Sequence, residues 1–450
     1  MLNFLVFVFC YIGGFALALL SQPVWAFMLY QMVYFMNPLE RWWSYLVPNL
    51  SYSFFTVVLL LFVYIKKFKD HNLNRLFAAP PYKWALLFLF SFFLAKYYAD
   101  LPDAHDFAFT NLFKLIIIIS IAYKVVDSDK KLDRILYAYM AGATYLSFMV
   151  YQVGRNSGDR VEGVGTVDSP DTNDVAAALA PTLILAVYYF WQHTKKSVRF
   201  FVLVGAAFVA NAIVLINSRG SFLAVICGAA YFFMHAIFSK HRQKNQRASA
   251  IGLIFMGLLA LPFLVDESTI QRFMTIKTQE VTEEEETGAT RVFFWLAAME
   301  MAKDYPFGAG ANGFTLHAPD YIPLEVNSGG SRNRAVHSSW FEALTEVGYP
   351  GLFFMIMMVI SVFGVLKQCR KQVLSTGNID LYFKLIAMEG AFIAFLVAMT
   401  FLNRSRAEVF YWMVLFACCA YNVYVVRGRY GANDPLVATA QTPQSAQENR

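Results

Sequence analysis

The sequence predicts an all-α polytopic integral membrane protein with about 12–13 transmembrane helices. Hydrophobic residues make up 58% of the 450 residues and charged residues only 15%. Apolar segments recur along the whole chain, and most are close to the roughly 20 residues that a helix needs to cross the hydrocarbon core. Lysine and arginine gather in alternate loops, as they do when one set of loops stays in the cytoplasm. A soluble domain with a single anchor would not be so evenly apolar.

The apolar segments give the predicted helices in chain order. They lie near residues 3–20, 22–37, 52–65, 82–99, 109–126, 134–153, 175–192, 198–216, 219–238, 249–265, 350–368, 381–402 and 407–426. Only Ser21, Gln22 and Pro23 separate the first two, so they form either a tight hairpin or one broken element, and the parity of the N-terminus stays open. The first segment has no basic residue before it and no small-residue cleavage site, so we expect a retained helix and not a removable signal peptide.

The basic residues predict the orientation of the chain. We expect the basic loops to be cytoplasmic: Lys66–Lys69, Lys124–Arg134, Lys195–Arg199, Lys240–Lys244, Lys367–Lys371 and Arg427–Arg429. The alternate loops then face outward: Asp100–Asp106, Gly154–Asp174, Asn217–Gly220, Asp266–Gly348 and Asn403–Glu408. The net charge of +6 is explained by this topology and by contact with anionic lipid headgroups, so it gives no reason to expect a nucleic-acid partner.

The pattern divides the chain into four parts. These are an N-terminal transmembrane helix bundle (1–265), an outward loop carrying short helices (266–349), C-terminal transmembrane helices (350–426) and a cytoplasmic disordered tail (427–450). Within the loop, the acidic run Glu283–Glu286 is typical of a solvated surface, and Thr290–Met301 is predicted to be an amphipathic helix at the membrane interface. The glycines between Asp304 and Phe314 predict a tight turn, and no strand precedes them as in a phosphate-binding loop.

Cysteine and histidine usage argues against a disulfide framework or a metal centre. The cysteines lie inside the apolar spans or at a cytoplasmic end, so the outward loops hold none. No His or Cys pair recurs at a metal-binding interval, and no P-loop or dinucleotide fingerprint is present. We therefore expect neither a metal nor a cofactor.

Charged residues of the outward loops are the candidates for chemistry. His337 lies between a basic turn and a predicted helix that carries Glu342 and Glu346 on one face, before Tyr349–Gly351 kinks it. A lone histidine at such a junction is more often a cap than a catalyst. Here it is accompanied by outward arginines that depart from the positive-inside trend: Arg219, Arg291, Arg332, Arg334, Arg404 and Arg406. Arg219 alone would fit interfacial anchoring, but a cluster of guanidinium groups suits a diphosphate, which it binds through bidentate charge-assisted hydrogen bonds.

An ordered set of motifs resembles a known family. Ser218–Gly220, Arg291 with Trp295, Pro306–Gly310 with Phe314, and His337–Ser339 with Glu346–Gly348 and Gly351 are similar to the motifs of the O-antigen ligase and O-antigen polymerase superfamily. The resemblance covers about Gly154 to Gly351 and is specific in combination. In addition, Met36–Trp43 and Thr166–Ala176 resemble, more loosely, the O-glycosylation ligases associated with exosortase systems.

The resemblance implies a membrane glycosyltransferase with a GT-C-like fold in the bacterial inner membrane, with its active site facing the periplasm. Such enzymes move a glycan from undecaprenyl diphosphate, with inversion and without a metal, onto lipid A core, a growing polysaccharide or a protein hydroxyl. It also implies that Arg219 and Arg291 hold the diphosphate leaving group and that His337 acts on the acceptor hydroxyl. The expected substrate-binding residues are Arg334, Arg404, Ser338, Glu346 and Asn173.

Several alternatives stay open at this point. An O-antigen or polysaccharide polymerase would use the same donor and the same motifs, so the sequence does not identify the acceptor or the sugar. Glu342 or Glu346 would orient the His337 imidazole or would only belong to the helix surface. A transporter for the lipid-linked glycan is disfavoured, because only Glu389 and Lys114 lie inside predicted spans, whereas transporters place ionisable groups at the midplane.

Overall fold

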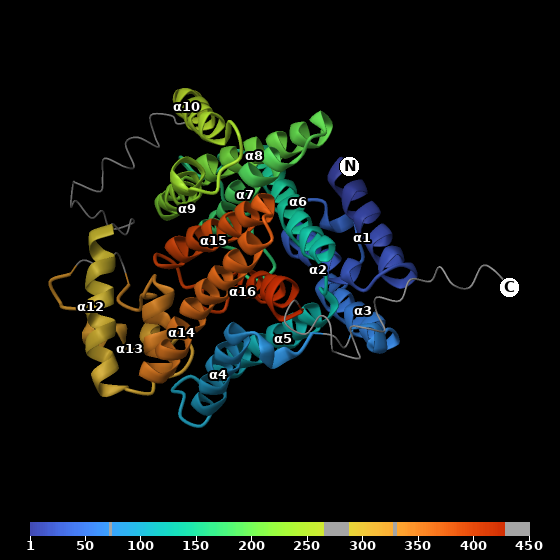
Figure 1. Ribbon diagram of the computed structural model, residues 1–450. Coiled ribbons are helices and arrows are strands. Elements are labelled where there is room, and N and C mark those ends of the chain that lie inside the picture. Colours follow the sequence, from blue (N-terminus) through green and yellow to red (C-terminus); the bar gives the residue numbers. More distant parts are fainter. Residues whose placement is uncertain (72–73, 265–287, 327–330, 428–450) are drawn as a thin grey trace.

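The computed structural model describes residues 1–71, 74–264, 288–326 and 331–427. The acidic run Glu283–Glu286 and residues 428–450 of the predicted tail lie outside them. In these ranges the chain forms fifteen α-helices and two isolated β-bridges, with no β-strand (Figure 1). The all-α prediction is therefore confirmed.

The helices follow one another through mostly short connections. The N-terminal helices are α1 (Leu2–Leu20), α2 (Val24–Met36), α3 (Tyr52–Lys66), α4 (Pro80–Ala95), α5 (Pro102–Val125), α6 (Asp129–Val153) and α7 (Thr172–Gln192). The others are α8 (Lys196–Ile216), α9 (Arg219–Phe238), α10 (Gln246–Leu264), α12 (Gly288–Asp304), α13 (Gly313–Tyr321), α14 (Ser339–Ser375), α15 (Ile379–Met399) and α16 (Glu408–Tyr421). Short 3-10 turns occur at Pro38–Glu40, Ser44–Leu46, Phe68–His71 and Leu76–Ala78, and a π-helical turn at Asn422–Val426.

Each predicted apolar span coincides with a helix or part of one. In the described part of the chain, eight helices are long and apolar enough to cross a membrane, and three shorter apolar helices accompany them, which confirms a polytopic membrane protein. The first two spans are separate helices that pack against each other, so the hairpin is the arrangement found. Helix α5 begins at Pro102, earlier than the hydropathy predicted, because proline is well tolerated in the first turn of a helix.

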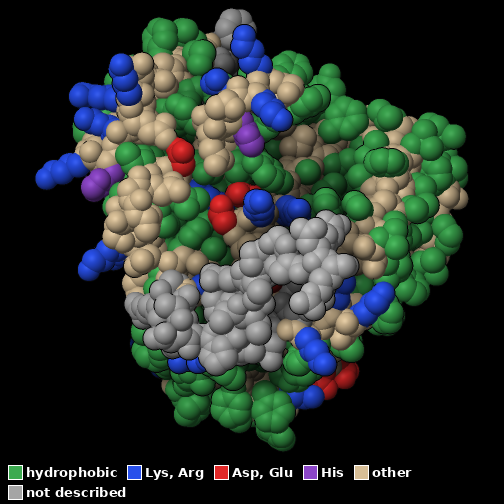
Figure 2. All heavy atoms as spheres, turned by 45° about the vertical axis from the view of Figure 1, so that its right-hand side comes forward, with side chains coloured by type: hydrophobic (Ala, Val, Ile, Leu, Met, Phe, Trp, Pro, Cys, Tyr) green, Lys and Arg blue, Asp and Glu red, His purple; other side chains and the backbone are tan. Residues whose placement is uncertain are grey.

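The outer surface of the bundle is apolar. Phe9, Phe62 and Phe201 are among many large hydrophobic side chains that are more than half exposed. In Figure 2, hydrophobic side chains cover most of the right-hand side of this face, whereas many lysines and arginines gather on the left. Contiguous apolar surface of this extent is unfavourable in water and suits contact with lipid tails.

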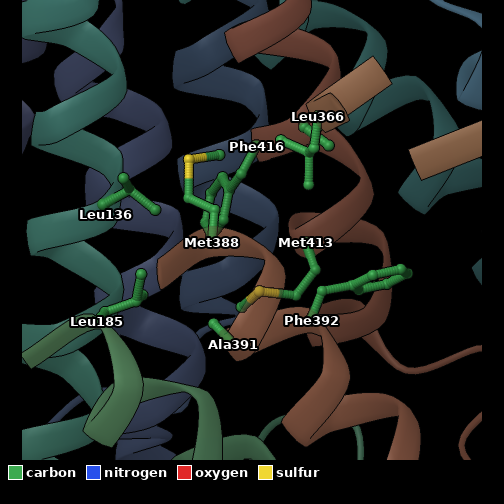
Figure 3. A pocket seen from close by; sticks show the side chains of 9 residues that line it. Leu136, Leu185, Leu366, Met388, Ala391, Phe392, Met413 and Phe416 are labelled. Carbon is green, nitrogen blue, oxygen red and sulfur yellow. The ribbon is translucent and has the colours of Figure 1, made fainter. Parts of the chain in front are cut away.

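The interior of the bundle is closely filled. Helix α15 packs against both α7 and α9, α14 packs against α4, and α2 packs against α6. Nine apolar side chains from α6, α7, α14, α15 and α16 surround a space of only about 10 Å³ (Figure 3). That volume holds about one water molecule, so this part of the core is not a ligand site.

Helix α14 is broken where a glycine-rich segment meets it. Val347 and Gly348 have non-helical backbone angles, with φ +68° at Gly348. The amide of Tyr349 donates to Pro306 O at 3.0 Å, and the amides of Ala309 and Gly310 donate to the carbonyls of Thr345 and Glu346 at 2.8 and 3.0 Å. The kink was expected at Tyr349–Gly351, but it lies just earlier in the chain, at Val347 and Gly348. Pro350 falls in the first turn after this break, where proline is tolerated.

Helices α12 and α13 form a small unit beside α14, at the side of the molecule away from α1 and α3 (Figure 1). They share a separate apolar core that includes Phe294, Met301, Phe314 and Val336. The opposite face of α12 exposes further apolar side chains, among them Phe293 and Leu296. This unit places Arg291 at the start of α12 next to the bundle.

Candidate functional site

The loop at residues 400–407, between α15 and α16, is bonded to the beginning of α14. The Ser339 hydroxyl donates to Leu402 O at 2.7 Å and accepts from the Arg404 amide at 2.7 Å. The Ser338 amide donates to Asn403 Oδ1 at 3.1 Å. These bonds join residues more than 60 positions apart in the chain and place the loop against the residues that follow His337.

His337 lies at this junction, immediately before Ser338, the N-cap residue of α14. It is half-buried, and its φ of +50° is in the left-handed region that non-glycine residues seldom adopt. The hydrogen bonds of Ser338 and Ser339 to the 400–407 loop fix the chain directly after it. A non-glycine residue held in this conformation is typical of functional sites, where the surrounding contacts determine the backbone.

Phe401 lies beside both segments that carry the arginines expected to hold a leaving group. Arg291 Nη1 donates to Phe401 O at 3.2 Å. Arg219 is the first residue of α9, and a Cβ on its neighbour Gly220 would lie 3.4 Å from Phe401 Cβ. Trp295, one turn after Arg291, has its ring 6.1 Å from that of Phe401. The beginnings of α9 and α12, distant in sequence, therefore meet at one residue of the 400–407 loop.

The ring of Trp295 also connects the residues around Phe401 to the beginning of α14, which follows His337. The Trp295 ring stacks on Phe341 with centroids 5.7 Å apart and an interplanar angle of 20°. Phe341 follows His337 by four residues, in the first turn of α14. The N-terminus of α9, the first turn of α12 and the beginning of α14 thus converge around the 400–407 loop.

Arg404 is buried in an ion pair. Its Nη2 lies 2.8 Å from Asp168 Oδ2, and its Nη1 lies 3.5 Å from Asp174 Oδ2. Asp168 also accepts from the Tyr34 hydroxyl at 2.7 Å and from the Thr166 hydroxyl at 2.8 Å. Burial opposes ionisation of Asp168, but Arg404 and these hydrogen bonds outweigh it and hold the pKa of Asp168 below its ordinary value. The pair fastens the 400–407 loop to the segment before α7.

Arg406 is held by the two carboxylates of α14. Its guanidinium bonds to Glu346 and approaches Glu342 Oε1 at 3.4 Å. Glu342 Oε2 accepts from the Ser405 amide at 3.0 Å, and Glu346 Oε1 accepts from the Asn312 amide at 2.9 Å. The predicted common face of the two glutamates is therefore used to position the 400–407 loop and the start of α13.

A large cavity opens beside this loop. It has a volume of about 960 Å³. Its polar wall includes Asp168, Glu342, Asn403, Arg404, Arg406 and Glu408, and its other wall consists of residues of α3 and α5. Asn403 lines the cavity and also accepts the hydrogen bond from the residue after His337. Asn403 thus connects the cavity lining to the beginning of α14.

The comparisons with known proteins bear on this same region. Residues 204–356 match the family model described as O-Antigen ligase. This segment, about a third of the chain, is similar to the O-antigen ligase family. It contains Arg219, Arg291 and His337, and the match confirms the resemblance seen in the motifs. No curated protein matches the chain.

Asn173 lies outside the matched O-antigen ligase segment but connects to it. Its Oδ1 accepts from Arg160 Nη2 at 2.7 Å, and Arg160 Nε donates to Ile216 O at 3.3 Å. Ile216 ends α8, three residues before Arg219. Arg160 was not among the predicted site residues, although it lies in the outward loop that was expected to face the same side.

Two further outward arginines of the matched segment, Arg332 and Arg334, differ in their contacts. Arg332 donates to the carbonyls of Pro319 and Ile322, so it caps the end of α13. Arg334 is half-buried in the segment that leads to His337, and its amide donates to Arg332 O at 3.0 Å. Sequence reasoning missed Asp168 and Glu408 as cavity-lining residues, since nothing in a local pattern shows which acids face a distant arginine.

Proposed function

We propose that the protein is a membrane glycosyltransferase that moves a glycan from undecaprenyl diphosphate onto an acceptor hydroxyl at the periplasmic face of the bacterial inner membrane. One observation carries the proposal: Arg291 bonds to Phe401 O, and Gly220, the neighbour of Arg219, lies against the Phe401 side chain, next to the helix that begins after His337. The similarity of residues 204–356 to the O-antigen ligase family supports a membrane enzyme of this general type. The donor, the side of the membrane and the residue roles are our inference.

The arginines suit the leaving group. Cleavage of the glycosyl–phosphate bond leaves the bonding electrons on the diphosphate oxygen and gives the sugar oxocarbenium character. Guanidinium groups fixed near that oxygen stabilise the developing charge and form bidentate hydrogen bonds to it. In this mechanism Arg219 and Arg291 supply the positive charge without a metal ion.

His337 suits the acceptor hydroxyl. A ring nitrogen of its imidazole accepts the hydroxyl proton while the acceptor oxygen forms a bond to the anomeric carbon. Attack from the face opposite the departing diphosphate inverts the configuration at that carbon. The bonds of Ser338 and Ser339 fix the backbone directly after His337, which limits the positions that its side chain can take.

The other predicted binding residues act around this centre. Glu346 positions Arg406, and Arg404 positions the 400–407 loop through Asp168. Asn173 supports the end of α8 through Arg160. We assign Arg334 and Ser338 to contacts with the substrate, because both belong to the segment around His337.

Two other functions, a polymerase and a transporter, are compatible with some of these observations. A polymerase would use the same donor site with a polysaccharide acceptor. A transporter is disfavoured by the pairing of charges inside the helices: Lys384 lies 2.7 Å from Asp129 and 2.6 Å from Asp133, and Glu389 lies 3.2 Å from Arg370. Paired ions of this kind stabilise a fixed arrangement of helices.

The proposal is tested with purified protein and a glycan linked to undecaprenyl diphosphate. We expect undecaprenyl diphosphate to be released only when an acceptor is added, and the glycan to appear on that acceptor. His337→Ala serves as the inactive control. Movement of intact donor across the bilayer without release would contradict the proposal and favour transport.

A further inference from the structure

Residues 306–312 run between two parts of the molecule and are bonded to both. On one side, the amides of Ala309 and Gly310 donate to carbonyls of α14 at its break. On the other side lies the connection between α4 and α5, where the Tyr98 hydroxyl donates to Phe307 O at 2.9 Å and the Asp100 amide donates to Ala309 O at 3.0 Å. Helix α4 itself packs against α14 (Figure 1). The position of the segment therefore depends on both elements.

His105, in the first turn of α5, also holds this segment. Its side chain is fully buried. Its Nδ1 lies 3.0 Å from the Ala311 amide nitrogen, and its Nε2 lies 2.8 Å from Phe92 O. An amide N–H only donates and a carbonyl oxygen only accepts, so Nδ1 carries no proton and Nε2 carries one. The arrangement therefore requires the neutral imidazole, protonated at Nε2.

The Ala311 contact is connected to the 400–407 loop. Ala311 and Asn312 both line the 960 Å³ cavity. The Asn312 amide donates to Glu346 Oε1 at 2.9 Å, and the other oxygen of Glu346 bonds to Arg406 of the loop. A shift of Ala311 would therefore displace the neighbouring amide and, through Glu346, the loop.

Protonation of His105 would break its contact with Ala311. A proton on Nδ1 would point at the Ala311 N–H, which is also a donor, so the hydrogen bond would be lost and a charge would be buried. Both ring nitrogens face backbone groups, so within the described ranges no carboxylate bonds to the imidazole to balance that charge. The contact therefore holds while the imidazole is neutral and is lost as the pH falls.

The charged groups around His105 do not offset this effect. Lys96, just after α4, pairs with Asp106 of α5 at 3.1 Å. The Arg406 guanidinium lies 5.4 Å from the centre of the Phe92 ring, on which the imidazole stacks with centroids 5.7 Å apart. Arg406 is in turn bonded to the two carboxylates of α14. The nearby acids are thus paired with other bases, and a charge on His105 would add to that of Arg406.

A second histidine near the same segment responds to protons in the opposite direction. His317 of α13 has its Nε2 2.7 Å from Asp100 Oδ2 and its Nδ1 3.9 Å from Asp320 Oδ2. Protonation would strengthen these contacts instead of breaking them. His317 is therefore a matched control, since it is a titrating imidazole whose protonation does not release Ala311.

We propose that His105 is a positioning residue that holds residues 306–312 in place only while its imidazole is neutral, so that acidification releases the segment and displaces the 400–407 loop. The inference rests on the proposed function only in expecting transfer to slow when the loop is displaced. The release itself is measured without any substrate.

Hydrogen exchange of the full-length protein in detergent micelles, followed by mass spectrometry, measures the release. Exchange is compared at about pH 7.5 and about pH 5, on either side of the ordinary imidazole pKa of about 6.5, and each value is divided by that of the unfolded chain at the same pH. We expect the wild-type peptide that covers residues 306–316 to lose protection by roughly fivefold at the lower pH, because a hydrogen bond is lost. Helix α15 should stay protected, and its exposure would mean general unfolding and would overturn the proposal.

Two substitutions separate His105 from other titrating groups. The amide oxygen of His105→Asn takes the place of Nδ1 as the acceptor but does not titrate, so protection should persist at the lower pH. His317→Asn should keep the wild-type response. Equal protection of the wild-type segment at the two pH values, a response that persists in His105→Asn, or one that disappears in His317→Asn would overturn the proposal. The wild type and His317→Asn decide the test even where His105→Asn does not fold, since both keep His105.

Transfer rates distinguish failure of this inference from failure of the proposed function. A base at His337 would titrate in the wild type and in His105→Asn alike, so the ratio of their rates removes that effect. We expect the wild-type rate to fall relative to that of His105→Asn as the pH is lowered. A constant ratio would overturn the positioning role. If the segment is released as expected but no acceptor supports transfer at any pH, the proton-sensitive contact stands and the proposed function is wrong.

Discussion

Gly348→Ala is expected to disrupt the site from within α14. Gly348 has φ +68°, a conformation that costs an alanine about 1–2 kcal/mol. A Cβ there would also overlap Pro306 O and the backbone of Phe307. The added Cβ would push residues 306–310 away from α14. This would weaken the three backbone hydrogen bonds between them, each worth about 0.5–1.5 kcal/mol. The total loss is at most about 2.5–6.5 kcal/mol, the sum of these two contributions when all three bonds are lost.

The effect should be visible in both stability and activity. Glu346 lies two residues before Gly348 and holds Arg406 and the Asn312 amide, so displacement of the break should also misplace the 400–407 loop. Thermal unfolding of the purified protein and a transfer assay measure the two consequences. Gly364→Ala is the matched control, because it lies in the same helix with no atom near the added Cβ and should be neutral or stabilising. Equal melting temperatures for the two variants would refute the reasoning.

Three further predictions concern the histidine, the ion pair and the topology. His337→Ala should lower transfer by about a hundredfold or more without changing the melting temperature; near-normal turnover would make the residue structural. The folded pKa of Asp168 is lowered, so its stabilisation is present above its unfolded value of 3.8 and is lost as the pH falls through the folded value. The melting advantage of the wild type over Asp168→Asn should therefore shrink below that pH, and a constant difference would argue against an ionised Asp168. A reporter enzyme fused after Ser239 should report the cytoplasm and one fused within Glu283–Glu286 the periplasm, and the reverse would exclude periplasmic transfer.

Hydropathy predicts the helices well because crossing the membrane constrains length and polarity over a whole segment. It predicts their breaks less well. The kink was expected at Pro350 because proline breaks the interior of a helix. A proline at the start of a helical segment, however, is compatible with the helix. The break lies at Gly348 because the 306–310 segment approaches α14 there, and that contact is not encoded locally.

In the candidate site, too, contacts set by local spacing could be predicted from the sequence, whereas contacts between distant residues could not. The four-residue spacing of Glu342 and Glu346 predicted a common face, and both do reach Arg406. By contrast, the partner of Arg404 is Asp168, 236 residues away, and no periodicity indicates such a pair. The order of motifs predicted that Arg219, Arg291 and His337 belong together, whereas the residue that joins their segments, Phe401, carries no chemical signal in the sequence.

The central claim is that Arg219 and Arg291 hold the diphosphate as it leaves. It is tested most directly by the rate of acceptor-dependent undecaprenyl diphosphate release from Arg219→Lys and Arg291→Lys, measured with and without chelator. Arg242→Lys, in a predicted cytoplasmic loop, is the control. Lysine keeps the charge but loses the planar fork, so we predict severe loss in the first two variants, normal release in the third and no effect of chelator. Normal release from both variants, or strict dependence on added magnesium, would contradict the account.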